Sequence, residues 1–125
     1  MYVKTKENKE IMHSKDLETF LSLLRTTEEQ HNIHYDNVNK CDREQQNLLH
    51  DFELLDLNYN QRAKKATELK KTRLERRYSK DIVEMTSEVV QFCKDNRQFI
   101  QKTERLLGDL RKKEKDLENR VYKRR

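Results

Sequence analysis

Two histidines and a cysteine in the first third of the chain are the side chains with metal-binding chemistry. His31 and His34 are three residues apart, and Cys41 follows seven residues after His34, so a helix would place them along one face. Structural zinc sites need four donors, usually in close pairs, and no second pair follows. We therefore expect surface or seam positions for these residues, and no metal or cofactor.

A second group, His50 with Asp51 and Glu53, has the residue types of an acid-base site. Neighbouring residues on a helix point in different directions, so these side chains cannot converge. With a third of the residues apolar and 41% charged, the chain cannot build a deep pocket that excludes water. It contains no P-loop, glycine-rich nucleotide turn or nucleophile elbow. We expect a protein that is not an enzyme and has no catalytic residue.

Charge divides the chain into an acidic and a basic part. Between Ser14 and Asp56 there are ten acidic and four basic residues, whereas between Arg62 and Lys80 there are nine basic and two acidic residues. Such a chain is suited to bind either its own other half or a charged partner.

The acidic part could mimic the phosphates of a nucleic acid and occupy a basic groove on a partner protein. The candidate partner-binding residues are Glu28, Glu29, Asp36, Glu44, Asp51 and Glu53. The alternative is that they form an ordinary solvated helix surface.

The basic part could contact nucleic acid or an acidic protein surface. On one helix it would span roughly 27 Å, long enough to follow several phosphates. The candidate residues are Arg62, Lys65, Arg73, Arg76, Arg77 and Lys80. Against this reading, the charges are expected all round the helix, and Leu69, Leu74 and Tyr78 interrupt them. The alternative is a solvated helix whose charges meet the acidic part.

The elements that carry these residues are predicted to be helices, since the chain has no proline and one glycine, and its apolar residues recur periodically. A seven-residue repeat runs from Leu17 to Leu69, with one position formed by Leu17, Leu24, His31, Val38, Gln45, Phe52, Tyr59 and Ala66, and the other by Phe20, Thr27, His34, Cys41, Leu48, Leu55, Arg62 and Leu69. Its middle is polar and holds Asn32, Asn37 and Asn39, which are poor interior helix residues. We expect a break there, with Asp42 and Gln45 as a capping pair that restarts the helix; a break before Thr27 is the alternative.

From about Asp42 to Cys93 the pattern predicts one long central helix of about 75 Å, weakest at Asn58 and Asn60. After Arg73 the apolar series shifts phase, to a series that starts with Ile82 and Met85. A second break is expected around Lys94, Asp95 and Asn96, followed by a last helix from about Arg97 to Arg120. Gly108 within it costs about 1 kcal/mol relative to alanine.

The expected architecture is all-α: a long central helix with shorter helices packed back on it, in a helical hairpin or coiled-coil-like bundle. Residues 1–13 are predicted to be a flexible arm and residues 14–125 a single helical domain. Because the apolar stripes are narrow, we expect a homodimer. Absence of a long apolar segment or signal peptide predicts a cytoplasmic protein without a membrane span. There Cys41 and Cys93 would be small buried residues without a disulfide.

Several charged helix segments carry a resemblance. They are Leu48-Leu49-His50-Asp51-Phe52-Glu53-Leu54, Gln61-Arg62-Ala63-Lys64, Leu74-Glu75-Arg76-Arg77, Lys80-Asp81 and Glu118-Asn119-Arg120-Val121-Tyr122. From about Leu17 onward the chain resembles small uncharacterised all-helical proteins of phages and prophages of Gram-positive bacteria. That resemblance implies a phage-encoded regulator or inhibitor in a bacterial or phage-infected host cell, and implies no activity or functional residue.

The leading hypothesis is a non-enzymatic interaction protein that blocks a nucleic-acid-processing machine, such as a CRISPR effector, with its acidic part. One alternative is a nucleic-acid-binding dimer that uses residues 62–80. The other is a structural coiled-coil scaffold in which the acidic and basic parts pair.

Overall fold

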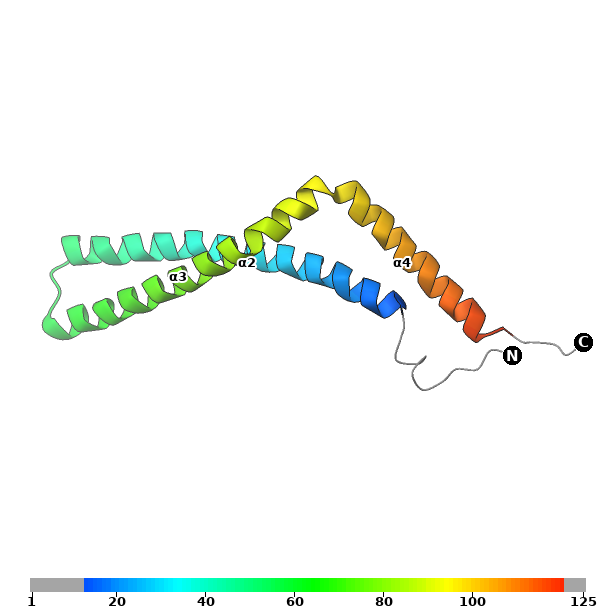
Figure 1. Ribbon diagram of the computed structural model, residues 1–125. Coiled ribbons are helices and arrows are strands. Elements are labelled where there is room, and N and C mark those ends of the chain that lie inside the picture. Colours follow the sequence, from blue (N-terminus) through cyan, green and yellow to red (C-terminus); the bar gives the residue numbers. More distant parts are fainter. Residues whose placement is uncertain (1–12, 121–125) are drawn as a thin grey trace, which may run out of the picture. The chain divides into compact units, whose positions relative to one another are not determined.

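The computed structural model describes residues 13–120, which form three α-helices (Figure 1). The helices are α2 (His13–Leu54), α3 (Tyr59–Asp95) and α4 (Arg97–Glu118). No strand occurs between residues 13 and 120, so the all-α prediction is confirmed. None of these helices combines the length and the apolar character that a bilayer crossing requires. The predicted N-terminal arm lies outside the described residues, except for His13, which begins α2.

The predicted break in the asparagine-rich window is wrong, as is the alternative before Thr27. α2 is continuous through both positions. Asn37 donates a hydrogen bond to Ser79 Oγ of α3 over 2.7 Å, and the neighbouring His34 also contacts Ser79. These interactions occupy polar side chains that would otherwise compete for the helix backbone, and so offset the weak helix propensity of the window.

The predicted central helix from Asp42 to Cys93 is also wrong, because the chain turns at residues 55–58. Asn58 and Gln61 form a reciprocal capping box at the start of α3. Gln61 N–H donates to Asn58 Oδ1 over 2.9 Å, and Asn58 N–H donates to Gln61 Oε1 over 3.1 Å. Two backbone donors that a helix start leaves without partners are thereby satisfied. The weakest point of the predicted helix is therefore where the chain reverses.

The break at Asn96 is confirmed, and the last helix begins at Arg97 as predicted. Asn96 makes no side-chain bond to the start of α4. Instead its Nδ2 donates to Phe92 O over 2.9 Å, so the side chain satisfies a carbonyl at the end of α3. The sequence predicts Asp95 or Asn96 as the cap at the start of the last helix; the Asn96 side chain instead binds the helix before it.

The chain divides into two compact units, and α2 and α3 contribute to both. We call Thr27–Gln91 the hairpin unit. The described residues before and after it, 13–26 and 92–120, form the terminal unit.

In the hairpin unit, α2 and α3 run antiparallel and pack along a continuous seam (Figure 1). On α2 the seam residues are Thr27, His31, His34, Val38, Cys41, Gln45, Leu48 and Phe52. Each of these is buried or half-buried, which confirms the predicted repeat over this range.

The α3 side of the seam has no phase change. Buried or half-buried residues follow one another at intervals of three and four, in the series Lys65, Leu69, Thr72, Arg76, Ser79, Val83, Thr86 and Val90. The shift predicted after Arg73 concerns only apolar residues. Thr72, Arg76 and Ser79 carry the seam through the region where apolar side chains are missing. Arg76 pairs with Asp42 there, and Ser79 contacts Asn37 and His34.

In the terminal unit, the first part of α2 packs antiparallel on α4. Leu21 and Leu24 of α2, Leu107 of α4 and Cys93 of α3 are buried. Glu114 accepts hydrogen bonds from Ser14 N–H and Ser14 Oγ, at 3.1 and 2.5 Å. The predicted seam position Phe20 is wrong here, since Phe20 is 38% exposed and Leu21 takes the buried place.

Candidate functional site

The residues with metal-binding chemistry lie in the polar part of the hairpin seam. His31 Nδ1 is 3.0 Å from Thr86 Oγ1, and His34 Nδ1 is 3.0 Å from Ser79 Oγ. The Thr86 hydroxyl donates to Ile82 O over 2.7 Å, so His31 Nδ1 is assigned as the donor in its own contact. Within residues 13–120, no three His, Cys, Asp or Glu side chains gather closely enough to hold a metal. These histidines join α2 to α3.

Cys41 sits in the same seam and is only 1% exposed. Its pKa is raised above the usual thiol value, chiefly by burial and then by the negative charges of Glu75 and Glu44. A thiol that stays protonated is a poor nucleophile and a poor metal ligand. Cys41 and Cys93 are both buried and neither forms a disulfide.

His50, Asp51 and Glu53, which have the residue types of an acid-base site, differ in their surroundings. His50 and Glu53 are exposed, whereas Asp51 is half-buried and lies 3.0 Å from Lys65 Nζ across the hairpin. Asp51 is therefore used in packing α2 against α3.

Contacts between the acidic and basic parts occur within the chain. Besides Asp51 with Lys65, Asp42 accepts a short hydrogen bond from Arg76 Nε. Glu44 lies 3.9 Å from Lys40, one turn before it on α2. Ion pairs as exposed as these contribute at most about 1 kcal/mol each, so they orient the two helices more than they stabilise them.

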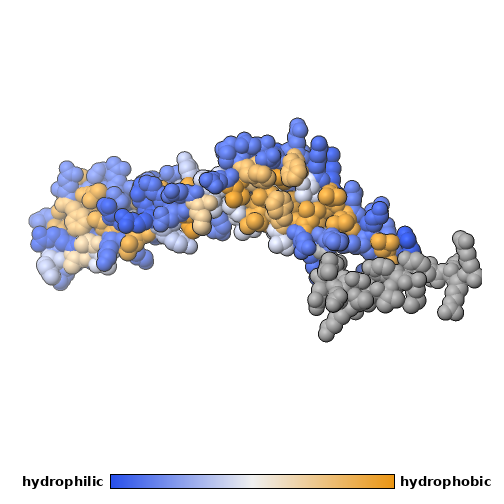
Figure 2. All heavy atoms as spheres, in the orientation of Figure 1, coloured by the Kyte–Doolittle hydropathy of each residue, from blue (hydrophilic) through white to orange (hydrophobic). Residues whose placement is uncertain are grey.

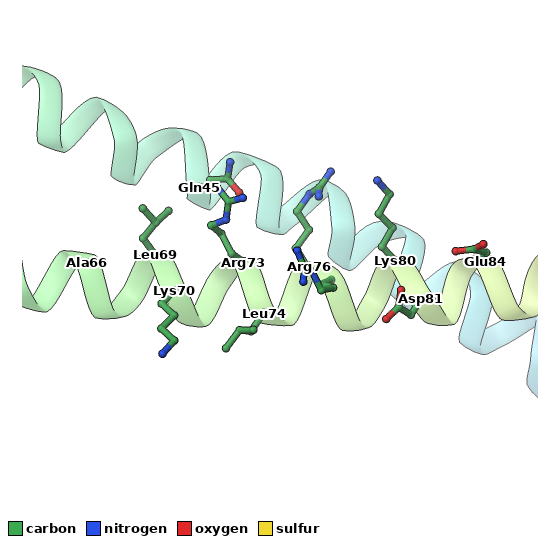
Figure 3. Close-up of a pocket in the computed structure, with 11 residues that line it drawn as sticks. Gln45, Ala66, Leu69, Lys70, Arg73, Leu74, Arg76, Lys80, Asp81 and Glu84 are labelled. Atoms are coloured by element: carbon green, nitrogen blue, oxygen red, sulfur yellow. The ribbon is translucent and has the colours of Figure 1, made fainter.

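A groove of about 760 Å³ runs along α3 in the hairpin unit (Figure 3). Its basic residues are Lys70, Arg73, Arg76, Arg77 and Lys80, and its acidic residues are Asp81 and Glu84. Ala66, Leu69 and Leu74 form its apolar part, and Gln45 reaches it from α2. In the close-up, Arg73, Arg76 and Lys80 extend from α3 toward α2.

Charge in this groove is largely uncompensated. Arg76 is paired with Asp42, but Lys70, Arg73, Arg77 and Lys80 have no ion pair within residues 13–120. All four side chains are exposed. Five basic residues against two acidic ones give the groove a positive field that attracts anions.

Four of the six predicted basic residues line this groove: Arg73, Arg76, Arg77 and Lys80. Lys65 belongs to the seam, and Arg62 is exposed on the first turns of α3 outside the groove. The expectation that basic charge is spread all round the helix is therefore only partly right. Lys70 was not among the predicted contacts, although the interval of three or seven residues that links Lys70, Arg73, Arg77 and Lys80 is visible in the sequence.

The six predicted acidic residues do not form one surface. Glu29 and Asp36 are seven residues apart and both exposed, so they share the outer face of α2. Glu44 and Asp51, also seven apart, are half-buried and flank α3. Glu28 is half-buried and Glu53 is exposed.

Comparison of the chain with protein-family models, curated proteins and solved structures finds no match. The chemistry of the groove is therefore the basis for assigning a function. It offers exposed cations beside short apolar stretches, and such a cluster of positive charge attracts anions.

Proposed function

We propose that this chain is a non-enzymatic interaction protein that binds a nucleic acid through the basic groove of its hairpin unit. The observation that carries the proposal is that four exposed cations, Lys70, Arg73, Arg77 and Lys80, share this groove without an ion-pair partner within residues 13–120. Acidic residues lie on α2, and those that pair with α3 bind other cations: Asp42 pairs with Arg76 and Asp51 pairs with Lys65.

The spacing of the cations suits a phosphate backbone. From Lys70 to Lys80 the α3 axis rises about 15 Å, a distance that spans two or three phosphates of one strand. Lysine and arginine contacts to phosphates release condensed counterions, which makes binding sensitive to salt but not to sequence. We therefore expect sequence-independent affinity for nucleic acid.

A mobility-shift titration with duplex and single-stranded DNA and RNA, at two salt concentrations, tests the proposal. We expect a shift at low salt that weakens as salt rises, with a log-log slope of about −0.9 per phosphate contacted on duplex DNA. The triple variant R73E/R77E/K80E should lose most of this binding and reduce the slope by about 3 × 0.9.

The matched control is the triple variant R62E/K64E/K71E, which changes the charge equally on exposed positions of α3 outside the groove. It should bind better than the groove variant by about tenfold or more, since it keeps the phosphate contacts. Equal loss in the two triples would mean that net charge alone attracts the nucleic acid. No shift of the unaltered protein at low salt would refute the proposal outright.

A second candidate is an inhibitor, of phage origin, that docks its acidic residues in the nucleic-acid groove of a host effector. It is favoured by the charges of Glu28, Glu29, Asp36 and Glu53, which have no ion pair within residues 13–120. Affinity purification from the host, with the unaltered chain and with E29K/D36K in parallel, would separate the candidates. Recovery of a nucleic-acid-processing protein by the unaltered chain and not by E29K/D36K favours the inhibitor. Recovery by both chains would show that Glu29 and Asp36 do not contribute to docking.

A further inference from the structure

In the terminal unit, α2 leaves apolar side chains on one edge of its packing face. Leu21 and Leu24 are buried, with 1% and 6% of their surface exposed. Residues of a helix follow each other at about 100°, so the residue that precedes each buried leucine projects from the same edge. These residues are Phe20 and Leu23, which are 38% and 58% exposed.

α4 repeats the arrangement. Ile100 and Leu107 face the core of the unit, and the residues that precede them, Phe99 and Leu106, are each 54% exposed. Leu117 continues this edge, at the eleven-residue interval that returns to the same side of a helix, and is 39% exposed.

Both edges lie on the same side of the helix pair. Bonds from Ser14 to Glu114 and from Glu18 to Arg111 show that α2 and α4 are antiparallel. Two antiparallel helices are related by a two-fold axis perpendicular to the plane that contains both. This rotation exchanges the helices but keeps each side of the plane in place. Residues that precede the buried positions therefore lie on the same side of the plane in both helices. Arg111 and Glu18 instead follow buried or half-buried positions, and their ion pair of 2.9 Å marks the opposite side.

The shared side is an apolar surface in the space-filling view. Figure 2 shows apolar side chains gathered along α4 and between it and the first part of α2. We call the surface formed by Phe20, Leu23, Phe99, Leu106 and Leu117 the apolar edge.

We propose that the apolar edge is where a second copy of this chain binds. From aromatic side-chain areas of about 150 to 250 Å² and smaller ones for leucine, the exposed fractions amount to about 400 Å². A standard interface buries about 800 Å² per partner, of which somewhat more than half is apolar. The apolar edge therefore matches the apolar share of one stable dimer interface.

Charge identifies the second copy as the occupant. Asp16 precedes Leu17 on the α2 side of the edge, and Lys113 precedes Glu114 on the α4 side. Both are exposed and lack an ion pair within residues 13–120. The contacts of Ser14 with Glu114 and of Glu18 with Arg111 place Asp16 level with Lys113.

At this level the surface carries acid on α2 and base on α4, and such a pair of charges is complementary to itself under a two-fold axis. When that axis runs along the helices, α2 of each copy lies over α4 of the other, and every neighbouring pair is antiparallel. Asp16 of each copy then meets Lys113 of the other, which makes the ion pair twice. The result is a four-helix bundle with the apolar edge in its core.

Sedimentation velocity of the full chain over a range of concentrations tests this pairing. The unaltered chain should sediment as a dimer. Leu106→Glu places a charge at the centre of the apolar edge and should raise the dimer dissociation constant at least tenfold, with unchanged helical circular dichroism. The matched control, Leu49→Glu, changes a leucine of similar exposure in the hairpin unit, 46% against 54%, and should remain dimeric.

Charge reversal tests the arrangement. Asp16→Lys should weaken the dimer, and D16K/K113D should restore it, since each new lysine meets a new aspartate. A chain that is monomeric at all concentrations overturns the proposal. So does an equal effect of Leu106→Glu and Leu49→Glu, and so does failure of the double reversal to restore the dimer.

Discussion

The two units of this chain solve the same packing problem with different side chains. In the terminal unit the buried positions are mainly apolar: Leu21, Leu24, Leu107 and Cys93. In the hairpin unit they are mainly polar, since Thr72, Ser79 and Thr86 are buried beside Cys41. The terminal unit thus depends on area removed from water, while the hairpin unit depends on hydrogen bonds and ion pairs that must be satisfied in place.

The difference shows how a polar seam can hold two helices together. Among the described residues, no buried side-chain nitrogen or oxygen lacks a hydrogen-bond partner. Hydrogen bonds between polar side chains form in only one register of two helices, whereas leucines can pack in several. The polar seam therefore fixes the position of α3 along α2, and with it the position of the groove residues. The terminal unit instead leaves several large apolar side chains exposed, among them Leu23, Phe99 and Leu106.

The largest effect should come from the apolar core. Leu21→Ala deletes a side chain that is 1% exposed and should lower the free energy of unfolding of the terminal unit by about 2 to 5 kcal/mol. Hydrogen exchange of α4 amides would measure it, and protection there should fall most. Leu49→Ala, at an exposed leucine of the same helix, should stay within about 0.5 kcal/mol. Equal losses would remove the contrast between the units.

Loss of one hydroxyl should be costly in the hairpin unit. Ser79 is fully buried, accepts from Asn37 Nδ2 and contacts His34 Nδ1. Ser79→Ala leaves these groups without their partner and should cost about 1 to 3 kcal/mol, measured by chemical denaturation. Ser87→Ala removes an exposed hydroxyl bonded only to Glu84 O of its own helix, and should have little effect. A neutral Ser79→Ala would show that the polar seam contributes no stability.

A smaller effect, dependent on pH, is expected in the terminal unit. The hydrogen bonds from Ser14 lower the pKa of Glu114 below its ordinary value of 4.5, which outweighs the opposing effect of burial. A depressed carboxyl pKa adds stability above the unfolded-state value, and this stability is lost as pH falls through the folded-state value.

Glu114→Gln should therefore lower stability by about 1 kcal/mol at neutral pH, in the range of a lost helix cap. The stability difference from the unaltered chain should shrink as pH falls from about 5 to 3. Thermal unfolding across this range is the measurement, with the exposed Glu104→Gln as control. A difference that stays constant with pH would contradict the role of the charged carboxylate.

The smallest effect is a gain. Gly108 lies inside α4 in an ordinary helical conformation, and an added Cβ would meet no atom within 4 Å. Gly108→Ala should raise stability by about 0.4 to 1 kcal/mol, because it reduces the entropy of the unfolded chain. The melting temperature should rise. Amide protection should increase in α4 and stay unchanged in the turn at residues 55–58. Destabilisation would mean that α4 packs more closely at this position.

The sequence by itself determined the helical class, the end of α3 near Asn96 and the seam positions of α2 from Leu24 to Phe52. These features follow from local propensity and from a repeat whose period matches the helix. It also identified most of the basic groove residues, since residues three and seven apart on one helix share a side regardless of what packs against it.

Only the tertiary structure decided where the chain reverses and which residues are buried. Several pairs have capping-box spacing, and three of them lie at the predicted breaks and weak point: Thr27 with Gln30, Asp42 with Gln45, and Asn58 with Gln61. A local rule ranks them alike, yet only the last one starts a helix, because the polar residues between Thr27 and Gln45 find partners on α3. Likewise the seam through Thr72, Arg76 and Ser79 is invisible to apolar periodicity, because a polar residue becomes a core residue only when its partner arrives from another helix.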